Sequence, residues 1–194
     1  MEMTSNAMSF SIGDPVPTKV DNLMICNIRC SAGVDEVFWS SKDITATPFL
    51  TSNYGVETKS FKLGLELSCS EEYLEFFNSL DAWCIEYLTE NSLRLFECQR
   101  SRDWIVSMYK PCTRKSGTFD PLLRTKILTS GFNTTRYWSA DKKSRRIPEA
   151  WLTVSMRVRM RIANLYISDT ACGIGLECTD IQVCKEFEAP ICPF

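Results

Sequence analysis

The stretch that most restricts the fold of this chain lies between residues 154 and 162, where apolar and polar side chains alternate strictly. The apolar set is Val154, Met156, Val158, Met160 and Ile162, and the set between them is Ser155, Arg157, Arg159 and Arg161. A period of two puts successive side chains on opposite faces of a β-strand. We therefore predict a long strand over residues 151–168, with one face in a core and three arginines about 7 Å apart on the other.

A second alternating stretch runs directly into the one strong helical pattern of the sequence. Residues 59–67 predict a strand with one buried face, and Ser68 or Ser70 suits the cap of a helix that continues to about Asn91. Its apolar side chains recur at helical spacing and predict a core face. They are Leu74, Phe77, Leu80, Trp83, Cys84, Tyr87 and Leu88.

Shorter strand patterns fill much of the remaining chain. They cover residues 36–40, Trp104 to Tyr109, Leu122 to Thr129, Phe132 to Ala140 and Ile174 to Val183, and Ser130-Gly131 suggests that the third and fourth of these pair. This order predicts a mainly β protein with one long helix, specifically an OB-type antiparallel β-barrel with the helix inserted after an early strand. We expect a single domain over residues 1–194: an irregular N-terminal arm (1–24), the barrel (25–187) and a C-terminal tail (188–194).

Residue usage excludes several classes of function. The chain has no histidine, which excludes Ser-His and Cys-His nucleophile activation. Its ten cysteines contain no Cys-x-x-Cys pair, so we expect free thiols used as small apolar residues, with no metal and no cofactor. No apolar run approaches the length of about 20 residues that a membrane span needs, and no secretory signal pattern is present. These features predict an intracellular protein of the cytoplasm or nucleus.

Charge is divided sharply along the chain. Residues 100–161 contain 15 Lys or Arg and 4 Asp or Glu, a net charge of +11, whereas the remainder has 7 basic and 20 acidic residues, a net charge of −13. A basic block of this size indicates a polyanionic partner or an acidic protein surface. Phosphates along a nucleic acid would suit the three arginines of the long strand. The alternative is a ladder of ion pairs with a neighbouring strand, which carries Glu177 and Asp180.

Aromatic residues are interleaved with these charges, as in proteins that stack single-stranded bases on rings. We expect Trp104 and Phe132 to be core residues, and at least one of the rings of Tyr137 and Trp138 to be exposed. The predicted nucleic-acid-binding set joins the basic residues to three of the rings. It consists of Arg100, Arg102, Tyr109, Lys110, Arg114, Lys115, Arg136, Tyr137, Trp138, Lys142, Lys143, Arg145, Arg146, Arg157, Arg159 and Arg161.

This layout resembles the OB-fold single-stranded DNA-binding proteins of short-tailed bacteriophages and the related replication proteins of large eukaryotic DNA viruses. The resemblance covers residues 58–187 and rests on the order of five segments. These are the strand 61–67 before the helix, Tyr109-Lys110-Pro111, the strand from Leu152 to Val158 with Asn164-Leu165-Tyr166-Ile167, the glycines Gly173 and Gly175, and Asp180-Ile181-Gln182-Val183. The end of the chain departs from the family's acidic tail, because residues 186–194 keep a terminal aromatic but only two acids.

The resemblance implies a non-enzymatic protein that coats single-stranded DNA in replication or recombination, with RNA left open as a ligand. Homo-oligomers are compatible with it, whereas a membrane or a small-molecule substrate is not expected. One alternative is a viral structural or assembly protein that self-associates through its acidic and basic faces. Another is a metal-dependent nuclease using Asp103, Asp120 or Asp141, although lone aspartates are usually caps or turn residues.

Overall fold

Two strands of 15 residues, β11 (Val154–Ser168) and β12 (Cys172–Glu186), are the longest strands in the described part of the chain. The computed structural model describes residues 10–19, 22–30, 38–39, 44–45, 47–50, 63–68, 71–115, 121–129, 131–146 and 154–186. The chain divides into unit 1 (residues 1–35, 69–121 and 162–176) and unit 2 (residues 36–68, 122–161 and 177–194), and β11 and β12 contribute to both. The single domain remains a prediction.

The strands of unit 1 surround the turn between β11 and β12. Strand β1 (Phe10–Pro17) pairs antiparallel with β2 (Leu23–Cys30), which pairs antiparallel with the end of β11. Strand β7 (Tyr109–Lys110) runs parallel to the start of β12, and β8 (Thr113–Arg114) follows it. Gly173 belongs to this pairing: a Cβ there would lie 2.7 Å from the carbonyl oxygen of Lys110, so only glycine allows the two strands to approach this closely.

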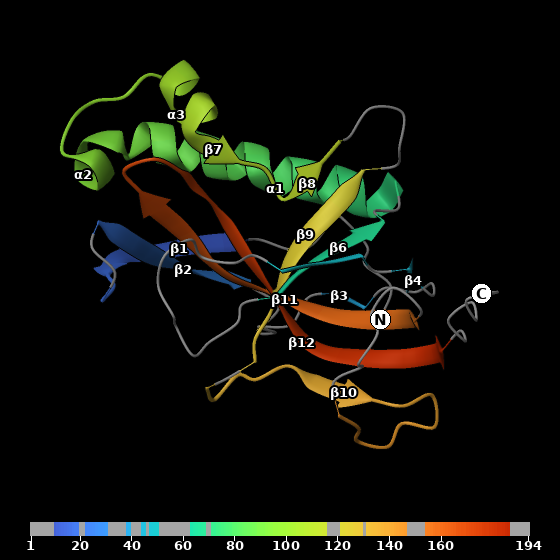
Figure 1. The fold of residues 1–194 in the computed structure, drawn as a ribbon. Coiled ribbons are helices and arrows are strands. Elements are labelled where there is room, and N and C mark those ends of the chain that lie inside the picture. The colour runs from blue at the N-terminus through green and yellow to red at the C-terminus, as the bar shows by residue number, and fades with distance from the viewer. Residues whose placement is uncertain are drawn as a thin grey trace, which may run out of the picture. The chain divides into compact units, whose positions relative to one another are not determined.

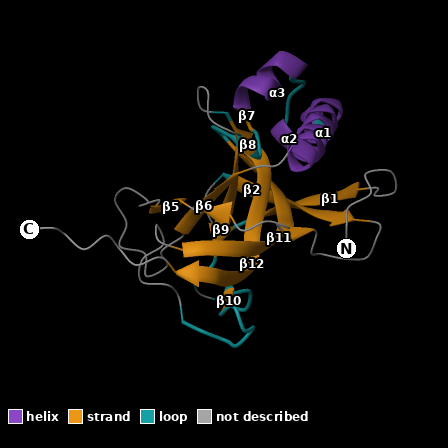
Figure 2. Ribbon diagram, turned by 90° about the vertical axis from the view of Figure 1, so that its right-hand side faces the viewer, coloured by secondary structure: helices purple, strands orange, loops and turns teal. Residues whose placement is uncertain are grey.

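Three helices complete unit 1, and Figure 2 shows them grouped together. Helix α1 (Glu71–Glu90) confirms the predicted helix, and Phe77, Leu80, Cys84 and Leu88 form its buried face. Leu74, Trp83 and Tyr87 are half-buried. The prediction of one helix is corrected, because α2 (Ser92–Phe96) and α3 (Arg102–Met108) follow. None of the helices in the described residues is long and apolar enough to cross a membrane.

Two segments of unit 1 differ from their predicted structure. Trp104 to Tyr109 has the aromatic and β-branched composition of a strand, but α3 forms there because Ser101 caps it, accepting a 3.2 Å hydrogen bond from the Trp104 N–H, and Ile105 is fully buried. The predicted irregular arm contains β1, despite Pro15 and Pro17. A strand at the end of the sheet order tolerates a missing N–H, and its register shifts between Ile12 and Pro15.

The described part of unit 2 consists of strands and the loops that connect them. The strands are β3 (Phe38–Trp39), β4 (Ile44–Thr45), β5 (Thr47–Leu50), β6 (Leu63–Ser68), β9 (Leu122–Ile127), β10 (Arg136–Trp138) and the parts of β11 and β12 that belong to this unit. Strand β6 pairs antiparallel with β5 and β9, while β3 and β4 pair antiparallel with β11. Leu65, Leu67, Ile127, Met156, Val158 and Ile181 are among its buried core residues.

The chain is mainly β, as predicted, but its sheet is mixed rather than antiparallel. Strands β7, β9 and β10 all pair parallel with β12, and the strand order of the described residues is an open path from β1 to β5 rather than a closed barrel. The predicted hairpin between Leu122–Thr129 and Phe132–Ala140 is also wrong. Only residues 136–138 of the second segment form a strand, and its partner is β12 (Figure 1), because side-chain bonds to Cys178 and Asp180 fix it there.

Several expectations fall outside what the structure describes. Ser70 as a helix cap, residues 151–153 of the long strand, Asp120 and the tail 188–194 lie outside the described residues. The cysteines that are described fit their predicted role. Seven are free thiols, and five of these are buried: Cys26, Cys84, Cys112, Cys172 and Cys178.

Candidate nucleic-acid interface

The β10 segment, defined here as residues 131–146, carries the densest positive charge of unit 2. It contains five basic residues, Arg136, Lys142, Lys143, Arg145 and Arg146, against the single acid Asp141, a net charge of +4. All but Arg145, which is half-buried, are exposed. The segment consists of the short strand β10 with one loop before it and one loop after it, and Figure 1 shows it beside β12.

The described residues 131–134 before β10 present a ring to solvent. Leu128 and Thr135 close the loop, because the Thr135 N–H donates to the Leu128 carbonyl and the Leu128 N–H donates to the Thr135 hydroxyl, both at 2.9 Å. Gly131 adopts a φ of 94°, which favours glycine. Phe132 is 110% exposed, so the prediction of a core residue was wrong: the loop leaves it no partner surface among the described residues.

Strand β12 anchors the base of this loop. The Thr135 hydroxyl donates a 2.7 Å hydrogen bond to the carbonyl oxygen of Cys178, and the side chain of Thr135 is buried. A buried hydroxyl that both accepts and donates a hydrogen bond holds its backbone in one position. Phe132 is therefore an exposed ring on a loop whose ends are fixed to the sheet.

The loop after β10 is closed in a similar way and carries lysines. The Ser139 N–H donates to the Lys143 carbonyl at 2.9 Å, and Trp138 and Ser144 form an isolated bridge. The amide of Gln182 on β12 donates to the carbonyl oxygens of Ser139 and Ala140. Lys142 has a φ of 62°, and its side chain is exposed. This second loop thus holds cations at the other end of β10.

Asp141 serves this turn rather than a catalytic site. It accepts hydrogen bonds from the Lys143 ammonium at 2.9 Å and from the Ser139 hydroxyl, and these lower its pKa. Asp103, the other described aspartate of the nuclease alternative, lies in the first turn of α3. In the part of the chain that the structure describes, no group of Cys, Asp and Glu side chains is arranged to hold a metal ion.

A cavity of about 380 Å³ lies beside β10 and is called the β10 pocket here. Arg136, Trp138, Lys142, Arg159, Asp180 and Gln182 line it. Three cations and one carboxylate give these residues a net charge of +2. Such a cavity, with a ring and several donors on its walls, has the chemistry that a nucleotide needs.

Asp180 organises the β10 pocket, although it is only 3% exposed. Its Oδ2 accepts from Nη2 of Arg136 and its Oδ1 pairs with Nε of Arg136, both at 2.8 Å, and Oδ1 also accepts from the Trp138 indole N–H at 2.8 Å. Arg159 lies 3.8 Å away. Burial opposes ionisation of this carboxyl, but the hydrogen bonds from Arg136 and Trp138 outweigh it, and its pKa is lowered.

The arginine row of β11 lies on one face, as predicted, with Met156, Val158 and Met160 buried on the other. Two of the three arginines nevertheless form the ladder that was the alternative. Arg161 donates to Glu177 at 2.7 Å, and Arg159 is 3.8 Å from Asp180. Arg157 is exposed. Carboxylates of β12 therefore balance part of the charge that we had expected to face an external anion.

The prediction for Tyr137 and Trp138 was wrong, because neither ring is exposed. Both are half-buried, and the hydroxyl oxygen of Tyr137 is buried. Burial raises the pKa of Tyr137. Trp138 lines the β10 pocket, so part of that side chain faces the cavity.

The other six predicted residues belong to unit 1. Lys110, Arg114 and Lys115 are exposed, whereas Tyr109 is 5% exposed and donates its hydroxyl to Asp81 at 2.7 Å. Tyr109 is thus a core residue and not a stacking platform. Arg102 pairs with Glu86 at 2.7 Å, and Arg100 stacks on the half-buried Trp104, which we had expected in the core.

Sequence reasoning missed Phe132 and Gln182, and it considered Asp180 only as an ion-pair partner of the β11 arginines, not as the partner of Arg136 and Trp138. Phe132 follows Ser130-Gly131 and precedes Asn133-Thr134, all common turn residues, and a ring at the tip of a turn has nothing to pack against. These neighbouring turn residues would therefore have indicated from the sequence that Phe132 is exposed. No local signal marks Gln182 or the contacts of Asp180 with β10, because these contacts join residues more than 40 positions apart.

Fold and site together define a mainly β chain with a basic surface that carries rings. No protein-family model matches it, and neither does any curated protein. Among solved structures, the chain is similar to the single-stranded DNA-binding protein from bacteriophage Enc34, with 12% sequence identity and a TM-score of 0.46. The match covers 93% of this chain and 93% of that one.

Proposed function

We propose that this protein binds single-stranded DNA through the β10 segment. The observation that carries the proposal is the combination of Phe132, which is fully exposed, with five basic residues in the same 16-residue segment. Phenyl rings stack on bases of any sequence, and the lysine and arginine side chains neutralise phosphates. A surface of this chemistry binds with little sequence preference.

Its anchoring to β12 supports the proposal. Thr135 fixes the Phe132 loop to Cys178, Gln182 fixes the lysine loop through Ser139 and Ala140, and Asp180 holds Arg136 in place. Groups already fixed in the free protein lose less conformational freedom when a ligand binds. Lys142 and Arg146 remain exposed on this framework and supply charge for the phosphates.

Single strands suit this surface better than duplex DNA. In a duplex the bases already stack on each other, so an exposed ring such as Phe132 gains little there, whereas an unpaired base offers a free face. The surface also has no helix in the described residues of unit 2 that would enter a major groove. We therefore expect a preference for single strands.

The strand pairing of unit 2 supports the OB-type arrangement. Strands β4 and β5 are one residue apart in the chain, yet β4 pairs with β11 and β5 pairs with β6. This short stretch therefore connects β11 to β6, which β12 and β9 separate in the strand order. OB folds bind oligonucleotides across such a sheet. Coating of single-stranded DNA in replication or recombination, inside the cell, is the role that we propose.

The direct test is fluorescence anisotropy with labelled oligo-dT and with a duplex of equal length. We expect Phe132→Ala to weaken oligo-dT binding by about 1–3 kcal/mol, a factor of about 5 to 150 in Kd. Leu93→Ala is the matched control, because Leu93 is an exposed apolar residue of unit 1 at 63% exposure. Equal affinity for duplex and single strand, or equal Kd values for the two variants, would contradict the proposal.

Salt dependence tests the cations separately from the ring. Lys142→Gln should reduce the slope of log K against log salt by about 0.7, the contribution of one phosphate contact on a single strand. Lys19→Gln, at an exposed lysine outside the basic block, should leave the slope unchanged. If both variants keep the wild-type slope, Lys142 does not contact phosphate.

A second candidate is self-association, favoured by the charge of α1. That helix contains six acidic and no basic residues, and although Asp81 is buried, the exposed Glu71, Glu75, Glu86 and Glu90 would face the β10 segment of another copy. Analytical ultracentrifugation distinguishes the two functions. Oligomers that dissociate in high salt, together with no affinity for oligonucleotides, would favour self-association.

A further inference from the structure

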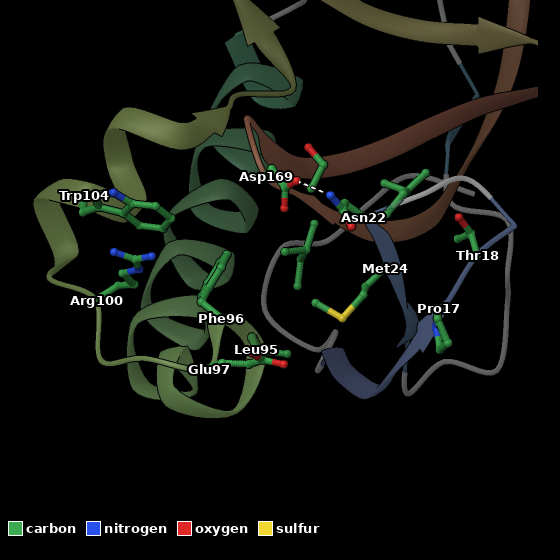
Figure 3. A pocket seen from close by; sticks show the side chains of 13 residues that line it. Pro17, Thr18, Asn22, Met24, Leu95, Phe96, Glu97, Arg100, Trp104 and Asp169 are labelled. Carbon is green, nitrogen blue, oxygen red and sulfur yellow. Dashed lines mark hydrogen bonds between the residues drawn. The ribbon is translucent and has the colours of Figure 1, made fainter.

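Unit 1 contains a cavity of about 600 Å³ that the proposed function does not use. Figure 3 shows its walls: Pro17 and Met24 from the first two strands, Leu95 and Phe96 from α2, and Arg100 with Trp104 near the start of α3. Its volume falls in the range of about 300–1,000 Å³ that is usual for small-ligand sites.

Arg100 is held in a fixed position at one side of this cavity. Its backbone N–H donates to the hydroxyl of the buried Ser92 at 3.1 Å, and its guanidinium lies 4.3 Å from the centre of the Trp104 ring. Trp104 in turn meets Phe96 edge to face, with ring centres 5.3 Å apart. The side chain therefore loses little freedom when it binds a further group.

The Nε of Arg100 is buried and donates to no acceptor among the described residues. Other arginines differ in this respect. Arg94, Arg102 and Arg161 each pair with a carboxylate at 2.7 Å. Buried donors are almost always bonded, because an unmet one costs the desolvation of the group. An acceptor that comes from outside the unit would satisfy this N–H.

The other residues that line the cavity restrict which kind of ligand can supply that acceptor. Leu23, Met24, Leu95, Phe96 and Ile167 provide apolar surface for the body of a ligand. Glu97 and Asp169 also line the cavity, and Asp169 accepts a hydrogen bond from the Asn22 amide at 2.5 Å. Two nearby carboxylates oppose a dianionic phosphate more strongly than a single negative charge. The planar guanidinium matches a carboxylate well.

We propose that this cavity binds an organic carboxylate with an apolar or aromatic body, the carboxylate pairing with Arg100 and the body packing beside Phe96 and Leu95. The ligand is either a free small acid or the acidic residue of a peptide. This site is independent of the β10 segment and of the proposed binding of DNA.

The test is two-dimensional NMR of the full chain, following the Arg100 Nε–H and Trp104 indole N–H signals. The probes are 3-phenylpropionate and the capped peptide Leu-Phe-Glu-Leu, each with its neutral partner, 3-phenylpropanamide or Leu-Phe-Gln-Leu. We expect a saturable shift of both signals with at least one acid and none with its neutral partner. Whichever acid binds identifies the source of the ligand.

Variants test whether the NMR shifts depend on the pairing of the ligand's carboxylate with Arg100. Arg100→Lys keeps the charge but removes the Nε–H, and should weaken binding at least about tenfold, as for loss of a charge-assisted hydrogen bond. Arg102→Lys is the matched control and should bind as the wild type does, while Glu97→Gln should bind more tightly. The proposal is overturned if the neutral partners bind equally well, if phosphate or oligo-dT shifts both signals more readily, or if no probe shifts them.

Discussion

Two buried aspartates, one in each unit, show how the partners of a carboxylate decide its role. Asp81 in unit 1 is 6% exposed and accepts from two neutral donors, the Tyr109 hydroxyl at 2.7 Å and the Cys112 N–H at 3.0 Å. Asp180 in unit 2 is 3% exposed, but Arg136 and Trp138 bond to it and Arg159 lies nearby. Burial is similar, whereas the charge of the partners is not.

The pKa values of the two carboxyls move in opposite directions for this reason. Burial raises the pKa of Asp81, and the hydrogen bonds from Tyr109 and Cys112 only partly oppose it. At Asp180 burial acts in the same sense, but charged and indole donors outweigh it and the pKa is lowered. Asp81 thus helps to close a core, while Asp180 fixes cations at a surface.

Two phenylalanine rings, one buried in unit 1 and one exposed in unit 2, give the largest expected effect. Phe77 is fully buried and Phe132 is fully exposed. Phe77→Ala should lower the free energy of unfolding by about 3–5 kcal/mol, and Phe132→Ala should change it by less than about 0.5 kcal/mol. Urea unfolding followed by circular dichroism measures both. A large loss for Phe132→Ala would mean that its ring is packed.

The next effect compares Asn substitutions at the two aspartates near neutral pH. Asp180→Asn should cost about 1.5–3 kcal/mol, because arginine and indole groups only donate and the new amide NH₂ would face donors. Asp81→Asn should cost less than about 1 kcal/mol, since the Tyr109 hydroxyl can reverse and accept from that NH₂.

Tyr109→Phe sharpens this second comparison. It removes the hydroxyl that bonds to Asp81, so its cost in the Asp180→Asn background should equal its cost in the wild type, whereas its cost in the Asp81→Asn background should differ. Equal costs for the two Asn variants in urea unfolding would show that the charge of the partners does not matter.

The pH dependence of stability follows from the two pKa directions and is smaller. A lowered pKa at Asp180 stabilises the fold above the ordinary value of 3.8, and this contribution is lost as the pH falls through the folded pKa. A raised pKa at Asp81 gives a contribution that is complete below 3.8 and is lost as the pH rises through the folded pKa.

Comparing each Asn variant with the wild type from pH 3 to pH 7 separates the two contributions. The deficit of Asp180→Asn should shrink toward low pH, whereas Asp81→Asn should gain on the wild type toward high pH. Parallel curves for the three proteins would contradict both pKa directions.

Ion pairs provide the smallest contrast. Arg161 and Glu177 of unit 2 are 25% and 18% exposed, whereas Arg102 and Glu86 of unit 1 are 56% and 54% exposed. A double-mutant cycle should give about 1 kcal/mol of coupling for the first pair, while the exposed pair should give less because solvent screens it. A stronger coupling for Arg102 and Glu86 would reverse this ranking.

Local patterns predicted the elements well where one face is buried. The spacing of Phe77, Leu80, Cys84 and Leu88 located α1, and the alternation around Met156 and Val158 located β11. Patterns failed where a single side chain decides the outcome. Ser101 caps α3 in a stretch of strand-forming residues, and Thr135 joins β10 to β12 rather than to β9.

The candidate site was predicted only in part. Charge counting identified Arg136, Lys142 and Arg159, which line one pocket. It placed Tyr109 among the binding residues, although Asp81, 28 positions earlier, holds it in the core. It also missed Phe132, because a phenylalanine was assigned to the core without regard to the turn residues on both sides of it.

The sequence by itself determined the periodic elements and the division of charge, because both depend only on the order of neighbouring residues. Tertiary structure decided which cations keep their charge for a ligand and which are balanced within the protein. Glu177 and Asp180 lie on β12, and pairing brings them to Arg161 and Arg159 of β11. Coulombic attraction acts over a few ångströms in space, so the positions of the charges along the chain do not reveal it.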